Sequence, residues 1–71
     1  MLVKRTAVLK KIKVAARKAG VQYGTVELTN HTGVIVGSVR STLGRHAEID
    51  DVTARKFFDQ FQEVLGKGWW R

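Results

Sequence analysis

The sequence has no cysteine, no proline and no long apolar run. Without cysteine the chain has no disulfide, no thiolate metal ligand and no thiol nucleophile. No stretch is apolar enough to span a bilayer, and charges interrupt the N-terminal segment, so we expect neither a membrane span nor a secretory signal. The expected location is cytoplasmic. The 71 residues predict one domain, residues 1–71, with a small core built by helix–sheet packing.

Acidic residues are absent from the first twenty positions. That segment carries seven lysines and arginines, and the whole chain has a formal net charge of +7, so the excess charge lies at the start of the sequence. A basic helix face can simply be solvated, but solvated faces usually mix both signs, whereas an all-basic face suits a polyanion. We expect nucleic acid rather than a membrane as the partner, because the apolar face of this segment is needed for the core.

Residues 4–19 predict an amphipathic helix, because apolar residues recur at three- and four-residue spacing and Gly20 follows the last of them. Alternating residues rich in β-formers then predict three short strands, which lie within residues 21–28, 34–36 and 39–44. Short polar turns separate these strands, which favours an antiparallel meander.

After a connection over residues 44–49, a second helix is expected over 51–65. Asp50 or Asp51 would cap this helix, and its three phenylalanines would fill the core. The order helix, three strands, helix predicts an α+β two-layer sandwich, α-β-β-β-α, with both helices on one face of a three-stranded antiparallel sheet. Double-stranded-RNA-binding domains share this arrangement.

Two histidines are the side chains that ordinarily titrate near neutral pH. His31 follows Asn30 in the turn before the second strand, and His46 follows Arg45 after the third. A histidine in a turn is often only structural, but His31 could also move a proton at a ribose 2′-hydroxyl or at the leaving oxygen during RNA cleavage. His46 could bond its own loop or, with Arg45, contact phosphate. Two histidines fifteen positions apart predict no metal site, and no cofactor is expected.

Several features occur together over nearly the whole chain. They are the basic segment Lys4–Ala19 followed by Gly20-Val21, Asn30-His31, Arg45-His46-Ala47-Glu48-Ile49, Ala54-Arg55-Lys56, and the closing run Leu65-Gly66-Lys67-Gly68-Trp69-Trp70-Arg71. In this combination the chain resembles the HicA family of toxin mRNA interferases. The closing run and the arginine–histidine pair are the most specific parts of the resemblance.

The resemblance implies a double-stranded-RNA-binding-like fold, cleavage of mRNA by one active-site histidine, and neutralisation by a HicB-type antitoxin. The family's histidine aligns with His31, although Thr29-Asn30 stand where glycine and serine are usual and Leu43-Gly44 stand where a proline is common. The expected function is a metal-independent endoribonuclease that inhibits translation, monomeric when free and hetero-oligomeric with its antitoxin. The expected RNA-binding residues are Lys10, Lys13, Arg17, Lys18, Arg40, Arg45 and His46.

Two other functions stay open from the residues. A non-catalytic double-stranded-RNA-binding module would have the same topology, but such domains typically carry lysines where this chain has Asp50-Asp51. A basic adaptor or DNA-binding protein is the third hypothesis. The tail residues Trp69 and Trp70 could pack on the core, stack on bases or contact the antitoxin.

Overall fold

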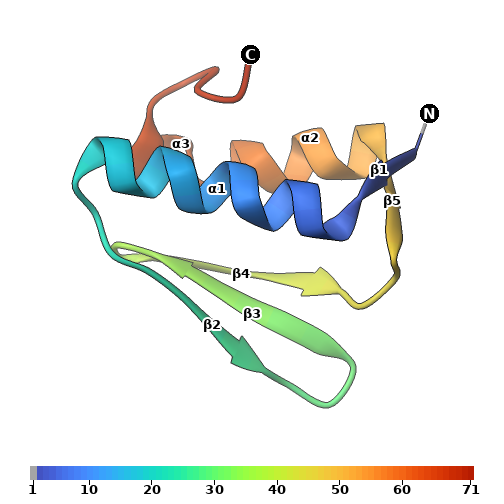
Figure 1. Cartoon of the computed structure of the whole chain (residues 1–71). Coiled ribbons are helices and arrows are strands. Elements are labelled where there is room, and N and C mark those ends of the chain that lie inside the picture. Colours follow the sequence, from blue (N-terminus) through green and yellow to red (C-terminus); the bar gives the residue numbers. More distant parts are fainter. Residues whose placement is uncertain (1) are drawn as a thin grey trace.

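The structure is a computed structural model that describes residues 2–71, so residue 1 of the predicted domain lies outside it. Its helices lie on one face of a three-stranded antiparallel sheet, which leaves the other face of the sheet uncovered (Figure 1). The helices are α1 (Arg5–Ala19), α2 (Asp51–Asp59) and α3 (Gln62–Leu65). The sheet contains β2 (Tyr23–Glu27), β3 (His31–Val36) and β4 (Val39–Gly44), and a second, two-stranded sheet contains β1 (Leu2–Lys4) and β5 (Glu48–Asp50).

The predicted meander is confirmed in the order β2-β3-β4. Its second strand begins at His31 and not at residue 34, so His31 lies in the strand itself and the expectation that it lies in the turn is wrong, because residues 31–33 pair with β4. Alternation along β3 buries Thr32, Val34 and Val36 beneath the helices. His31, Gly33 and Ile35 alternate with them and therefore belong to the uncovered face. The α+β class and the antiparallel strands are thus as expected.

α1 begins at Arg5, one residue later than predicted, because Lys4 belongs to strand β1, which the sequence analysis missed. β1 pairs antiparallel with β5, and Lys4 lies opposite Glu48. The backbone N–H of Arg5 donates to the carbonyl of Ala47 at 2.9 Å, which satisfies one of the free donors at the start of α1. The prediction that residues 44–49 form only a connection is therefore wrong, since Glu48 and Ile49 lie in β5.

The second predicted helix, residues 51–65, is wrong as a single element. It is divided into α2 and α3, and the N–H groups of Gln60 and Phe61 bond to the carbonyls three residues earlier. The apolar stripe continues across this break, and Phe61 is fully buried. Asp50 is the cap, because its Oδ2 accepts from the backbone N–H groups of Val52 and Thr53 at 3.1 and 3.4 Å.

The core lies between the helices and the larger sheet. All three phenylalanines are buried, as expected, and the rings of Phe57 and Phe61 meet edge to face with centroids 5.2 Å apart. Ala16 is fully buried, and its small side chain lets α1 pack closely on the core. The remaining buried apolar residues are Val8, Ile12, Val34, Val36, Leu43, Ile49, Ala54 and Phe58.

Candidate active site

The turn before β3 and the loop after β4 lie at the same end of the larger sheet, because the register pairs His31 with Gly44. The hairpin between β2 and β3 is closed by a hydrogen bond of 2.8 Å from the Leu28 N–H to the His31 carbonyl. Arg45 and His46 follow Gly44 directly. The two sequence motifs that carry the histidines are therefore brought together by strand pairing, although they are far apart along the chain.

The two histidine side chains belong to the same face of the sheet. Gly44 alternates with the buried Leu43, so the direction of its missing Cβ is toward the uncovered face, as for His31. The Cδ2 atom of His46 lies 3.5 Å from the position that this Cβ would occupy. Directly paired residues have Cβ atoms about 5 Å apart, so the His46 ring reaches within about 9 Å of the Cβ of His31. Both histidines are exposed to solvent.

Arg45 is held against the β2–β3 hairpin. Its Nη2 lies 2.8 Å from Glu27 Oε2 and also donates to the carbonyl of Leu28. Longer contacts of 3.5 Å join the guanidinium to the carbonyls of Thr29 and His31. The Arg45 side chain stays 42% exposed, so these contacts do not enclose it. Arg45 therefore fixes the hairpin that carries His31.

A second arginine reaches the same end of the sheet from α1. Arg5 Nε donates to the Gly44 carbonyl at 3.2 Å, and its Nη2 donates to the hydroxyl of Thr32. Thr32 in turn donates to Glu27 Oε1 at 3.1 Å. Glu27 thus joins both arginines, directly to Arg45 and through Thr32 to Arg5. This network, which we call the Arg5–Arg45 network, connects α1, the hairpin and the end of β4.

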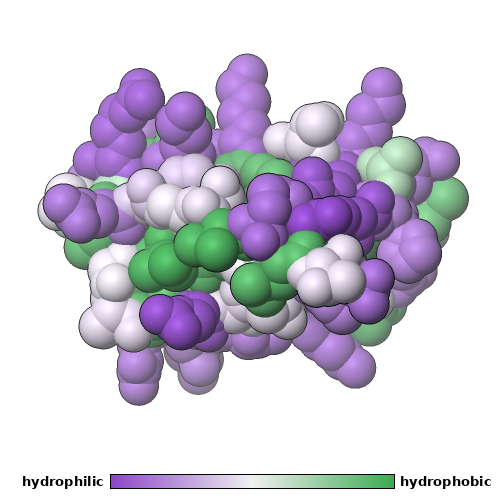
Figure 2. Space-filling model, turned by 90° about the horizontal axis from the view of Figure 1, so that it is seen from below, coloured by the Kyte–Doolittle hydropathy of each residue, from purple (hydrophilic) through white to green (hydrophobic). Residues whose placement is uncertain are grey.

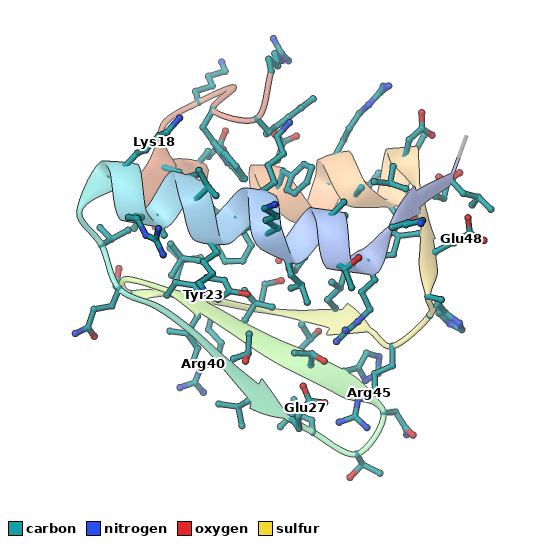
Figure 3. The ribbon with its side chains drawn as sticks, viewed as in Figure 1. Lys18, Tyr23, Glu27, Arg40, Arg45 and Glu48 are labelled. Atoms are coloured by element: carbon teal, nitrogen blue, oxygen red, sulfur yellow. The ribbon has the colours of Figure 1, made fainter. Side chains whose placement is uncertain are left out.

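The basic residues of α1 lie on two sides of the helix. Lys10, Lys13 and Arg17 line a cleft of about 460 Å³ together with Tyr23 of β2. Burial raises the pKa of the Tyr23 phenol, and the nearby charge of Arg5 lowers it by a smaller amount. Lys18 instead borders the tail residue Trp69. Figure 3 shows Lys18 at the opposite end of α1 from Glu27 of the hairpin and from Arg45, which contacts it.

The remaining predicted RNA-binding residue, Arg40, lies apart from the basic helix. It is an exposed residue of β4, and its side chain points away from the helices (Figure 3). The structure therefore brings together His31, Arg45 and His46, and separately gathers Lys10, Lys13 and Arg17. It does not join Arg40 to either group.

The tail folds back on the core. Trp69 Nε1 donates to the Phe58 carbonyl at 3.0 Å, and Trp70 Nε1 donates to Asp59 Oδ1 at 2.7 Å. The rings of Phe58 and Trp69 meet edge to face, 5.2 Å between centroids. This arrangement agrees with the packing interpretation of the tail, and base stacking and antitoxin contact stay untested.

Sequence reasoning missed Arg5, Thr32, Glu27 and Tyr23 as members of these groups. Thr32 shares the period-two face of Val34 and Val36, which was the available signal for its burial, whereas Glu27 joins it only through the strand register. Within residues 2–71, no group of three or more His, Cys, Asp or Glu side chains is placed to hold a metal ion. None of the helices in this range is long and apolar enough to cross a membrane.

Comparison with known proteins gives no family, curated protein or solved structure that matches this chain.

Proposed function

We propose that this chain is an RNA-binding endoribonuclease of the HicA-like mRNA interferase kind, which cleaves mRNA with His31 and inhibits translation. The observation that carries the proposal is the pairing of His31 with Gly44, which brings Asn30-His31 and Arg45-His46 to one end of the sheet. The placement of the helices on a single sheet face also supports a double-stranded-RNA-binding-like arrangement, with β1 and β5 as an addition to it.

The chemistry asked of His31 is proton transfer. A neutral imidazole takes the proton from the ribose 2′-hydroxyl while the oxygen attacks phosphorus, or an imidazolium gives a proton to the departing 5′-oxygen. Its exposure at the start of β3 leaves the ring accessible to a nucleotide. His46 and the exposed part of Arg45 would contact the phosphate and stabilise the charge that develops on it.

RNA would be gripped mainly by the cleft on α1. Lys10, Lys13 and Arg17 present their positive charges beside the half-buried ring of Tyr23, so phosphate contacts and one aromatic surface occur together. α1 is about 22 Å long at 1.5 Å per residue, so its basic residues extend several nucleotides away from the hairpin. In a cell, a HicB-type antitoxin would neutralise the enzyme.

The test is cleavage of a labelled mRNA by the purified chain in the presence of EDTA. The wild type should produce fragments, and His31→Ala should lower the rate by about 10²–10⁴-fold while leaving the gel shift of RNA intact. His46→Ala is the comparison variant, because it removes an exposed histidine from the same sheet end; it should weaken RNA binding and lower the cleavage rate by much less than His31→Ala does, since it removes a phosphate contact and not the proton-transfer group. DNA of the same sequence lacks the 2′-hydroxyl and should stay intact.

Two outcomes would contradict the proposal. If His31→Ala cleaves RNA as fast as the wild type, the assignment of His31 is wrong. If the wild type shifts RNA but leaves it intact, the chain is a non-catalytic RNA-binding module. Expression in cells gives an independent measurement, since the wild type should arrest growth and His31→Ala should be harmless.

A further inference from the structure

The uncovered face of the larger sheet carries a small apolar groove. It has a volume of about 220 Å³ and is lined by Val26, Leu28, Gly33, Ile35, Arg40 and Thr42. Val26 and Leu28 are large aliphatic side chains that are 50% and 46% exposed. Figure 2, which views this side of the molecule, shows apolar side chains gathered in the middle of the face with hydrophilic ones around them. We call this surface the sheet groove.

Gly33 makes the groove. A Cβ built at Gly33 would lie 3.8 Å from both Leu28 Cδ1 and Val26 Cβ, so the absence of a side chain leaves a hollow between these neighbours. The exposed aliphatic side chains around this hollow are removed from water only when another molecule fills it. The helices all lie on the opposite face of the sheet, so no element among residues 2–71 covers this one.

The chemistry of the lining identifies the kind of occupant. No aromatic ring lines the groove, so it lacks the stacking surface that single-stranded nucleic acid uses. Its one charged lining residue is Arg40, and the chain carries a net charge of +7. A second copy would place Arg40 against Arg40 and two such positive chains together. A partner with acidic groups instead meets a complementary charge.

We propose that the sheet groove binds an acidic protein partner, which inserts an apolar side chain over Gly33 and presents a carboxylate to Arg40. The same face carries His31 at its end, so the occupant would lie beside the candidate active site. That the partner is an antitoxin rests on the proposed function. The binding of an acidic partner in the groove does not rest on that function.

The test begins with selection of random twelve-residue peptides displayed on phage against the immobilised full chain. Enriched peptides should combine Asp or Glu with a large apolar residue. Val26→Ser with Ile35→Ser, and separately Arg40→Glu, should weaken a selected peptide about tenfold or more, which is about 1.4 kcal/mol. The double variant removes two apolar contacts, and Arg40→Glu replaces an attraction for the carboxylate by a repulsion. Val52→Ser is the matched control, because Val52 is 51% exposed on α2, outside the groove.

Thermal unfolding of each variant shows whether it is folded, and Arg40→Glu keeps the apolar lining intact should the double variant unfold. No enrichment, enrichment of peptides without acidic residues, or equal binding to wild type and variants would overturn the inference. Concentration-dependent dimerisation that Val26→Ser with Ile35→Ser abolishes would assign the groove to a second copy. RNA cleavage by that double variant should equal the wild-type rate, and peptide binding can be scored even where the chain cleaves nothing, so the two proposals fail separately.

Discussion

Thr32 is the one polar residue among residues 2–71 that is buried, with an exposed fraction of 1%. Its hydroxyl accepts from Arg5 and donates to Glu27, so it holds together charged groups from α1 and from the hairpin. A buried hydroxyl with two charged partners contributes more than an exposed one, because water cannot replace those partners easily. Thr32 is therefore a structural support for the hairpin that carries His31.

We expect Thr32→Val to lower the free energy of unfolding by about 1–3 kcal/mol, because it removes both hydrogen bonds. That is a large share of the roughly 4–11 kcal/mol typical of a chain of this length. Urea unfolding gives the value, and Thr25→Val, at an exposed position of β2, is the matched control that should change it little. Equal stability of Thr32→Val and the wild type would show that the two hydrogen bonds of the Thr32 hydroxyl contribute nothing to stability.

Single residues also show where sequence reasoning stops. The expectation that Asp50 or Asp51 caps a helix rested on local chemistry, and Asp50 does so. The engagement of Arg45 with Glu27 could not be foreseen in the same way, because it depends on the register that brings β4 beside the hairpin. The position of Arg45 beside His46 placed it among phosphate ligands, whereas its Nη2 is engaged inside the protein by Glu27 and the Leu28 carbonyl.

At the level of helices and strands, periodicity predicted α1 and the order of the meander, but not the first three residues of β3, which are extended because they pair with β4. The missed strands β1 and β5 have three residues each and lie at distant positions in the sequence, so neither shows a measurable alternation of its own. The break between α2 and α3 could not be predicted from periodicity either. The apolar stripe runs unchanged through Phe61, and only the tighter backbone bonds at Gln60 and Phe61 mark the end of α2.

The tail gives the prediction at this scale. Trp69→Phe should lower the free energy of unfolding by about 1–2 kcal/mol, because it removes the donor to the partly buried Phe58 carbonyl while keeping an aromatic ring. Trp70→Phe should lower the free energy of unfolding by less than about 1 kcal/mol, because water can replace the indole N–H at the exposed Asp59 carboxylate. Chemical unfolding of both variants tests the contrast. Equal losses would mean that the two hydrogen bonds do not distinguish the residues.

For the whole molecule, charge and architecture give the surface two different sides, a basic side formed by the helices and a side formed by the uncovered sheet. The basic residues of α1 belong to the helix layer on one face of the sheet. The sheet groove lies on the other face of the sheet. The hairpin with His31 stands at the end of that sheet, and the His31 side chain belongs to the same face as the sheet groove. A protein in the sheet groove would therefore lie beside His31, whereas RNA held along α1 would have to extend past the edge of the sheet to reach that histidine.

This division predicts how RNA affinity responds to salt. For single-stranded RNA, each neutralised phosphate contributes about −0.7 to the slope of log K against log salt concentration. Lys13→Gln with Arg17→Gln should therefore make the slope shallower by about 1.4, because both residues line the α1 cleft. Titrations in the His31→Ala background keep the RNA intact. Lys56→Gln with Lys67→Gln removes the same charge from other exposed positions and should leave the slope unchanged. Equal effects of the two pairs would mean that net charge alone attracts RNA, and α1 would then lose its role as the binding surface.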